Sequence, residues 1–314
     1  NVAGELHFNI IGGTGFSTLS GSSMGSTALM GSLLVPEMER RGYKKRMAIG
    51  PILGTGGLAI IIPPSALAVL LATLAKVDIG ALLIAGIMPG LVLAGLYIAT
   101  IWIQTRLDPS AAPNYELEPV PLKQKLLLVV TDILPMISVM VFIVALMLLG
   151  FATPSEAAAF GALGAIVLAA IFRCMTWEAF KLSVIGALKV TLMAYLIVFG
   201  SATFSQLLAF SGASSGLIQW ATGFDLAPIL MLLAMFAVLL VLGTFMEQIS
   251  IMMLTVPFFF PLAQALGFDP IWFGILFIVN MEIGYMTPPF GFNLFYMKGV
   301  VPPSISMMDI YRSV

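Results

Sequence analysis

Long apolar segments dominate this chain and limit what it can fold into. About 20 mostly apolar residues cross the hydrocarbon core of a bilayer as one α-helix. Of the 314 residues, 60% are hydrophobic and 9% are charged, whereas a soluble domain carries about 25% charged residues. The sequence therefore predicts an all-α, polytopic membrane protein. Its apolar segments are residues 6–35, 47–75, 79–105, 126–149, 155–172, 189–210, 226–261 and 271–297.

The remaining composition argues against several kinds of site. The net charge of −1 gives no basis for binding nucleic acid. Cys174 is the one cysteine and His7 the one histidine, so an internal disulfide and a cysteine- or histidine-based metal cluster are excluded. The sequence shows no nucleophile–histidine pair and no phosphate-binding loop. We therefore expect no enzymatic activity and no organic cofactor, and any transport would be driven by an ion gradient.

Two of the apolar segments are too long for one span and are interrupted near the middle. Segment 6–35 is interrupted at Ser20-Gly21-Ser22-Ser23, and segment 226–261 is interrupted at residues 243–248. Each arm has about 15 residues, or roughly 22 Å of helix, which is shorter than the ~30 Å core. We interpret them as re-entrant hairpins, 6–38 and 226–261, that turn back near the midplane. Irregular backbone at that depth must line a cavity or be buried in protein.

Two further segments carry the signature of a broken helix. Residues 47–75 contain Gly54-Thr55-Gly56-Gly57 followed by Pro63-Pro64, and residues 271–297 contain Asn280 to Gly284 followed by Pro288-Pro289. Proline removes a backbone donor and clashes with the preceding turn. We therefore expect both helices to unwind, with Pro63-Pro64 and Pro288-Pro289 at the breaks of equivalent helices and with the site-forming breaks at Thr55–Gly57 and at Asn280–Thr287.

These interruptions repeat along the chain. One constant shift without gaps places Pro63-Pro64 on Pro288-Pro289, Gly42 on Gly267 and Ser22 on Glu247. Paired interrupted segments in two halves of a chain point to the binding site of a secondary transporter. The predicted organisation is a first repeat (1–105, with hairpin 6–38, broken helix 47–75 and helix 79–105), a proline-rich connector (106–125) and a second repeat (126–314, with helices 126–210, hairpin 226–261 and broken helix 271–297).

Basic residues set the expected orientation, because positively charged loops face the cytoplasm. The richest loop carries Arg40, Arg41, Lys44, Lys45 and Arg46. With that loop in the cytoplasm, the predicted hairpins place all but Lys76 of the 14 basic residues, and the connector, on the same side. The matching loop of the second half, 262–270, contains no lysine or arginine. The two repeats are therefore expected to be inverted relative to each other.

Several of these motifs resemble the large membrane subunit of the tripartite ATP-independent periplasmic (TRAP) transporters, within the wider ion-transporter superfamily. In the first half they are Leu19-Ser20-Gly21-Ser22-Ser23, Pro36-Glu37-Met38 and Ile61-Ile62-Pro63-Pro64-Ser65. In the second half they are Leu266-Gly267-Phe268-Asp269-Pro270, Glu282-Ile283-Gly284, Thr287-Pro288-Pro289, Gly291 and Asn293-Leu294-Phe295. The family's scaffold helices before the first hairpin and its final helix have no counterpart here, so we expect a fragment that starts inside a larger protein.

The resemblance implies an elevator-type secondary transporter in the inner membrane of a bacterium or archaeon. It implies sodium-driven uptake of a small organic acid, which a periplasmic substrate-binding protein delivers, with a small four-helix membrane subunit as the other partner. Two alternatives stay open. One is a sodium-coupled dicarboxylate or citrate carrier that needs no binding protein, and the other is an ion channel or membrane scaffold subunit. Selectivity in this family rests largely on the binding protein, so the substrate itself is not readable from this chain.

Two sodium or substrate sites are expected, one where each hairpin tip faces a broken helix, because unwound carbonyls and hydroxyls supply oxygen ligands there. The first comprises Ser20, Gly21, Ser22, Ser23, Thr55, Gly56, Gly57, Pro63, Pro64 and Ser65, and the second comprises Thr244, Glu247, Gln248, Asn280, Glu282, Gly284, Thr287, Pro288, Pro289 and Asn293. Small residues also suit tight helix packing alone. Glu247 and Glu282 are expected near the midplane, where an ionisable group is costly and points to function. Alternatively, each only orders a loop at a water-filled mouth.

Overall fold

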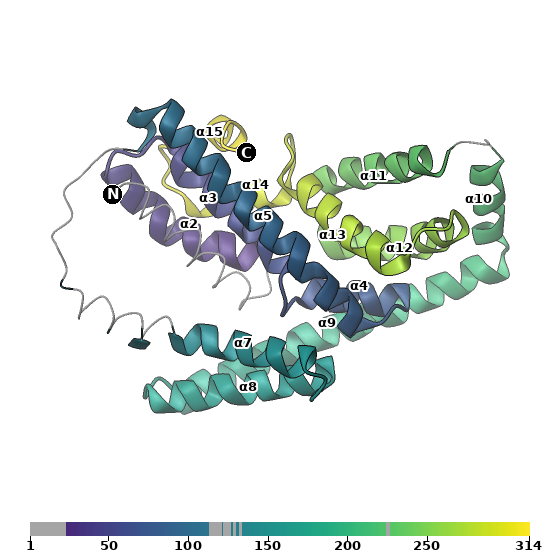
Figure 1. Ribbon diagram of the computed structural model, residues 1–314, viewed down its shortest axis with the longest axis horizontal. Coiled ribbons are helices and arrows are strands. Elements are labelled where there is room, and N and C mark those ends of the chain that lie inside the picture. The colour runs from purple at the N-terminus through teal and green to yellow at the C-terminus, as the bar shows by residue number, and fades with distance from the viewer. Residues whose placement is uncertain (1–22, 113–120, 122–126, 128–129, 132–133, 224–226) are drawn as a thin grey trace.

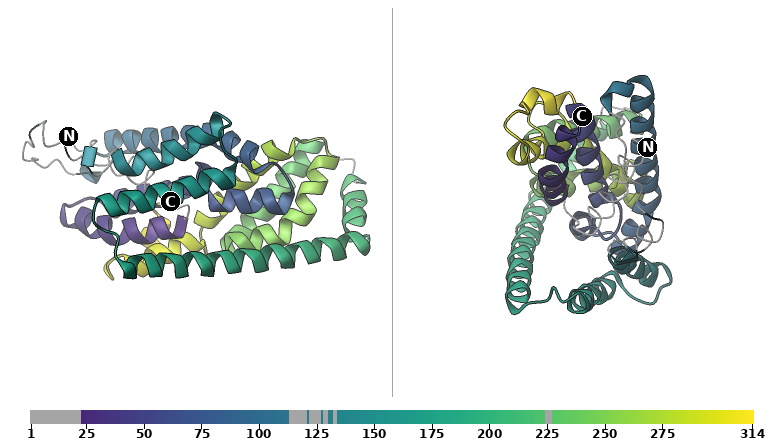
Figure 2. Two further views of the ribbon diagram at one scale, coloured as in Figure 1. Left: turned by 90° about the horizontal axis from the view of Figure 1, so that it is seen from below. Right: turned by 90° about the vertical axis from the view of Figure 1, so that its left-hand side faces the viewer.

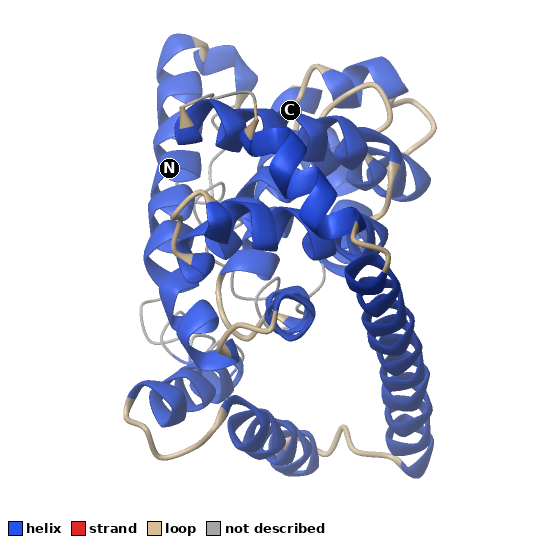
Figure 3. Cartoon of the chain, turned by 90° about the vertical axis from the view of Figure 1, so that its right-hand side faces the viewer, coloured by secondary structure: helices blue, strands red, loops and turns tan. Residues whose placement is uncertain are grey.

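The computed structural model describes residues 23–112, 121, 127, 130–131, 134–223 and 227–314, and within these ranges it contains helices and no β-strand (Figures 1 and 3). The helices are α2 (Ser23–Arg40), α3 (Lys45–Ile61), α4 (Ala66–Ala75), α5 (Ile79–Leu107), the 3-10 helix η1 (Pro109–Ala111), α7 (Leu134–Leu148), α8 (Pro154–Ile171), α9 (Trp177–Phe210), α10 (Ala213–Thr222), α11 (Pro228–Phe245), α12 (Gln248–Ala265), α13 (Pro270–Met286), α14 (Phe292–Val300) and α15 (Met307–Tyr311). The prediction of an all-α chain is confirmed for these residues.

Five of the described helices are long and apolar enough to cross a membrane. They are α5, α8, α9, α11 and α12, and the pair α3 and α4 makes a sixth span if it is counted as one helix bent by 45°. In Figure 1, α11, α12 and α13 pack together in one part of the molecule, and α2, α3 and α5 form a second group. α9 has 34 residues and runs along one side of the molecule (Figure 2).

Both broken helices are interrupted at their prolines and not at their glycines. α3 continues through Thr55-Gly56-Gly57 and ends before residues 62–65, which are not helical. α13 continues to Met286, and residues 287–291 separate it from α14. The expected breaks at Thr55–Gly57 and from Asn280 onward were therefore wrong, because they lay too early in the chain. A glycine inside a helix costs about 1 kcal/mol, which packing can offset, whereas a proline costs about 3 kcal/mol.

The helix bounds repeat at the same shift as the proline pattern, which carries position 63 onto position 288. This shift carries the last residue of α2 (Ser23–Arg40, which begins where the described residues begin) onto the last residue of α12 (Gln248–Ala265), and both ends of α3 (Lys45–Ile61) onto both ends of α13 (Pro270–Met286). These equivalent ends show a repeat of local structure. The inversion of the two halves across a membrane stays a prediction.

α2 and α12 also end in the same way. Gly42 and Gly267 follow them with φ angles of 80° and 85°, in the left-handed region that glycine adopts without a steric penalty. In each case the residue after the glycine donates its N–H to the carbonyl five residues earlier, at 3.0 Å. This is the Schellman arrangement, which satisfies carbonyls that the helix end leaves free.

The second predicted hairpin corresponds to α11 and α12, which pack on each other and are joined by Met246 and Glu247. Each helix has 18 residues, or about 27 Å, so the arms are longer than the predicted length of about 15 residues. Because this length approaches the thickness of the hydrocarbon core, re-entry stays a prediction. The first arm and tip of the other hairpin, including Ser20, Gly21 and Ser22, lie outside the described residues.

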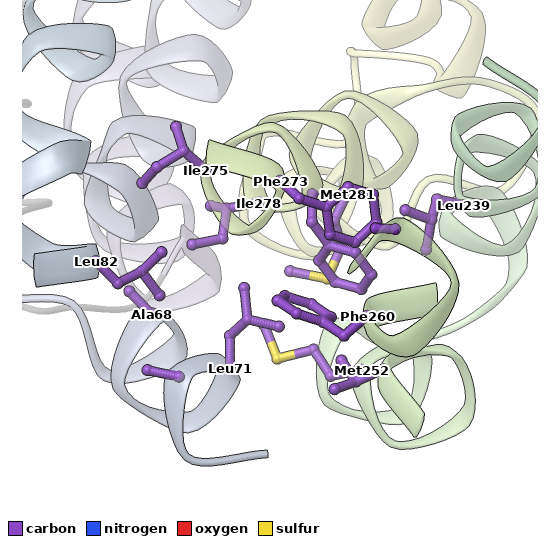
Figure 4. Close-up of a cluster of buried hydrophobic side chains, with 14 of the residues drawn as sticks. Ala68, Leu71, Leu82, Leu239, Met252, Phe260, Phe273, Ile275, Ile278 and Met281 are labelled. Carbon is purple, nitrogen blue, oxygen red and sulfur yellow. The ribbon is translucent and has the colours of Figure 1, made fainter. Parts of the chain in front are cut away.

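A buried apolar cluster joins the two groups of helices (Figure 4). Leu71 of α4 and Leu82 of α5 belong to it together with Phe260 of α12 and Phe273 of α13, and all four side chains are at most 2% exposed. The rings of Phe260 and Phe273 meet edge to face, with centroids 5.0 Å apart. Lipid tails are as apolar as these side chains, so close packing holds membrane helices together.

Ion pairs gather three chain segments at one end of the molecule. Lys44 and Arg46 each contact Asp108, which follows α5, at 2.7 Å. Lys45 contacts Asp309 of α15 at 2.8 Å. The predicted orientation assigns all three segments to the cytoplasmic side, and the ion pairs require them to lie on a common side.

Asp108 provides a pH-dependent test of this ion pairing. Hydrogen bonds from Lys44 and Ser110 lower the pKa of Asp108 to about 2, against about 3.9 in an unfolded chain. A carboxyl group with a lowered folded-state pKa stabilises the fold above its unfolded pKa, and this contribution is lost as the pH falls through the folded value. We expect Asp108→Asn to lower the melting temperature in detergent slightly at pH 7, and the difference to shrink between about pH 4 and pH 2. Glu178→Gln, at an exposed position on α9, is the control.

Gly243 of α11 and Gly284 of α13 let these two helices touch backbone to backbone. A Cβ atom added at Gly243 would lie 2.7 Å from the Cα atom of Gly284. We expect Gly243→Ala to push α11 from α13 and to destabilise the protein by about 1–3 kcal/mol, the usual cost of overpacking. Gly186→Ala on α9, where nothing lies within 4 Å, should be neutral or slightly stabilising. Thermal unfolding in detergent measures both, and equal melting temperatures would contradict the packing argument.

Candidate functional site

Glu282 is a buried carboxylate on α13, one turn before the helix break. Its side chain is 3% exposed and accepts two hydrogen bonds. Ser23 donates its hydroxyl to Oε1 at 3.1 Å, and Gln248 donates its side-chain amide to Oε2 at 2.7 Å. A buried charge is costly unless it is hydrogen-bonded. These two donors therefore hold Ser23 of α2 and Gln248 of α12 against α13.

The two donors occupy equivalent places in the repeat. Ser23 is the first described residue of α2 and Gln248 the first residue of α12, and the repeat shift carries one onto the other. The N-terminus of α12 carries partial positive charge, which favours a nearby anion. The first described residue of α2 and the first residue of α12 thus meet at one carboxyl group, although they belong to opposite halves of the chain.

Gly57 completes this arrangement from α3. A Cβ atom at position 57 would lie 2.8 Å from Cγ and 2.9 Å from Oε1 of Glu282. Under the same shift, position 57 is the equivalent of position 282. The two equivalent positions therefore face each other, and the space between α3 and α13 holds the side chain of only one of them.

Oxygen atoms without a hydrogen-bond donor lie beside the carboxylate. Thr27 Oγ1 and Asn293 Oδ1 are buried and have no hydrogen-bond partner among the described residues. Asn293 donates its amide to Ser23 Oγ at 3.3 Å. A Cβ atom at Gly56 would lie 2.8 Å from Thr27 Oγ1, 3.4 Å from the Ser23 carbonyl oxygen and 3.5 Å from Ser23 Oγ. Three oxygen atoms of α2 thus lie within 3.5 Å of one point on α3, and oxygen is the ligand type that a hard cation prefers.

Residues from both expected sites meet in this cluster, which we call the Glu282 cluster: Ser23, Gly56, Gly57, Gln248, Glu282 and Asn293, with Thr27 added by the structure. Four predicted hydroxyl groups instead donate to carbonyls nearby in sequence. They are Thr55 (to Pro51 and Ile52), Ser65 (to Ile60), Thr244 (to Val241) and Thr287 (to Ile283).

The remaining predicted residues have other positions. Asn280 donates to the Phe236 carbonyl at 2.9 Å and so ties α13 to α11. Gly284 lies against Gly243. Glu247 is half-buried at the start of α12 and makes no side-chain cap. Pro63 is buried and Pro64 half-buried in the first break, whereas Pro288 and Pro289 are exposed in the second.

Sequence reasoning missed two buried hydroxyl groups near the site. Thr27 follows Ser23 by one helical turn, so its position on the same face of α2 was a usable signal. Tyr285 follows Glu282 by three residues, and its hydroxyl is buried with no hydrogen-bond partner among the described residues. An isolated tyrosine in an apolar helix carries no such signal in the sequence.

Apolar helices, two broken helices in a repeat and a buried polar cluster between them define a multi-pass membrane protein of the transporter class. The profile of the family described as "Tripartite ATP-independent periplasmic transporter, DctM component" matches residues 3–314. The chain belongs to this family, and the resemblance seen in the sequence is confirmed.

Individual relatives agree with the family. The chain is 35% identical to the C4-dicarboxylate TRAP transporter large permease protein DctM of Pseudomonas aeruginosa, over 91% of this chain and 66% of that protein. It is 29% identical to the sialic acid TRAP transporter large permease protein SiaM of Vibrio cholerae, over 96% and 70%. It is 30% identical to the isethionate TRAP transporter permease protein DctMQ of Oleidesulfovibrio alaskensis, over 94% and 46%. The chain thus spans about two thirds of the first two relatives and about half of the third.

The contact between Gly57 and Glu282 gives a direct test of the site. We expect Gly57→Ala to displace the Glu282 side chain and to reduce activity of the assembled protein at least tenfold, because a 2.8 Å contact forces the carboxylate away from its donors. Gly95→Ala on α5, where nothing lies within 4 Å, is the matched control. Substrate uptake and the yield of folded protein are measured together. A Gly57→Ala variant with normal uptake would show that the position of Glu282 is unimportant.

Proposed function

We propose that this chain is the membrane-embedded core of a sodium-gradient-driven uptake system for a small organic acid. The observation that carries the proposal is the Glu282 cluster, where the starts of α2 and α12 meet two helices that break just beyond it. Paired interrupted helices hold the ion and substrate sites of secondary transporters. The substrates in the names of the three relatives, a C4-dicarboxylate, sialic acid and isethionate, are all organic acids.

Sodium is a co-transported substrate in the proposed cycle. The buried oxygen atoms of Ser23 and Thr27 beside Gly56, with Asn293 Oδ1, are the proposed ligands at the first site. The second site is proposed between the α11–α12 connection and the end of α13, at Thr244, Glu247, Asn280 and Thr287. The hydroxyl groups of Thr244 and Thr287 donate to backbone carbonyls within their own helices. Each hydroxyl oxygen therefore keeps its lone pairs, which can bind a cation.

The proposed cycle is of the elevator type, with both hairpins re-entrant. Unpaired oxygen atoms repel one another when the helix starts close, and a bound cation removes this cost. Sodium can shift the equilibrium only by its differential affinity for the closed state. By linkage, a substrate that prefers the closed state raises the affinity for sodium by the same factor.

The proposed setting is the inner membrane of a bacterium or archaeon. The proposed partners are a small four-helix membrane subunit and a periplasmic substrate-binding protein. The name DctMQ of one relative is compatible with a permease that joins two such subunits in one chain. A carrier that needs no binding protein is the alternative that the uptake experiment separates from this proposal.

The function is tested by uptake into proteoliposomes. The full-length permease and its small subunit are reconstituted, and labelled organic acids are offered with and without each candidate binding protein, under a sodium or a potassium gradient. We expect uptake only with sodium and a binding protein. Uptake without any binding protein would support the alternative carrier, and uptake that is equal in sodium and potassium would overturn the sodium coupling.

Thr27→Val tests the proposed first sodium site. Valine keeps the shape of the side chain and removes the buried Oγ1 oxygen, so one proposed ligand is lost. We expect the sodium concentration for half-maximal uptake to rise by about fivefold, the equivalent of ~1 kcal/mol, the scale of one hydrogen-bonding group. Ser32→Ala, on the exposed side of α2, is the control, because its hydroxyl bonds only to the Leu29 carbonyl. Equal sodium dependence in both variants would place the ion elsewhere.

A further inference from the structure

The two halves of the Glu282 cluster share a single acceptor. Ser23 of α2 binds one carboxylate oxygen and Gln248 of α12 binds the other. Among the lysine, arginine, aspartate and glutamate residues that the structure describes, only Glu282 is buried.

The repeat makes this sharing asymmetric. A fully symmetric protein would place one acidic residue in each half, at positions 57 and 282. These positions face each other, since a Cβ atom at Gly57 would touch Glu282 Cγ at 2.8 Å. Two carboxylates there would collide and repel each other. Glycine in the first half therefore leaves one carboxylate to serve both helix starts.

We propose that Glu282 is a positioning residue that couples the movement of α2 at Ser23 to the movement of α12 at Gln248. The inference rests on the proposed function, in which these parts of the two helices move during transport. When one donor leaves, one carboxylate oxygen loses its partner in a buried place, which is a large cost for a charged group. The side chain then turns toward water and releases the other donor as well. Sodium or substrate that closes one half thereby favours closure of the other.

Cysteine labelling tests the coupling without requiring transport. Cys174 is the one cysteine of the chain and is exposed, so Cys174→Ser gives a silent background. In the full-length permease in membranes with sodium, Met246→Cys reports on the connection before α12. We expect Ser23→Ala to raise its rate of labelling by a small maleimide about fivefold, the factor for ~1 kcal/mol. Ser32→Ala is the matched control on α2 and should leave the rate unchanged.

The reverse experiment should change labelling in the same direction, because a coupling between two sites acts both ways. Here the labelling rate of Met24→Cys is measured, because Met24 follows Ser23 in α2. Gln248→Ala is the substitution in the second half of the chain. Gln264→Ala, at an exposed position on α12, is its control. In a Glu282→Gln background, which keeps the size of the side chain and removes its charge, the effect of Ser23→Ala on Met246→Cys should fall below twofold.

Three results would overturn the inference. They are equal labelling of Met246→Cys in the Ser23→Ala and Ser32→Ala variants, equal labelling of Met24→Cys in the Gln248→Ala and Gln264→Ala variants, and an undiminished effect of Ser23→Ala in the Glu282→Gln background. If the Glu282→Gln variant does not fold, the labelling experiments with Ser23→Ala and Gln248→Ala still test the coupling. Sodium-dependent uptake by the parent protein is measured in parallel, so a failure of the proposed function is seen separately from a failure of the coupling.

Discussion

Burial of the Glu282 carboxylate is the constraint on which the arrangement of the other helices depends. A carboxylate taken out of water costs several kcal/mol unless hydrogen bonds satisfy it. Ser23 and Gln248 meet that requirement, which fixes the starts of α2 and α12 against α13. Gly57 admits the side chain, and the contact between Gly243 and Gly284 brings α11 against the same helix. The buried carboxyl group and this glycine contact thus tie together five helices from both halves of the chain.

The repeat is close in backbone and divergent in chemistry. Helix bounds, glycine caps and proline breaks recur at one constant spacing along the chain. The polar side chains at equivalent positions do not recur, since Ser23 corresponds to Gln248 and Gly57 corresponds to Glu282. The repeated backbone therefore carries one shared Glu282 cluster and not two copies of it. This is the physical reason for the proposed coupling between the two halves.

The outer surface reflects the surroundings of the chain. Ser201 is the one residue of the 34-residue helix α9 that is buried, and most of its other side chains are apolar. Such a helix is stable where lipid or a neighbouring membrane protein covers it. The basic residues that pair with Asp108 and Asp309 lie at one end of the molecule. Charged residues at an end and apolar residues along the sides are the distribution that a bilayer imposes.

The sequence by itself determined the helical class, the second hairpin's connection, the double-proline breaks, the family and the spacing of the repeat. These features depend on how a residue affects its own backbone, as Pro63 and Gly42 do, or on a long apolar run. Only the tertiary structure decided that Thr55-Gly56-Gly57 stays helical and that Thr27 joins the site. It alone placed Ser23 beside Glu282, which is 259 residues away, because such a contact depends on how whole helices pack. Residue type identifies the candidate site residues, and the packing of the helices determines which of them come into contact.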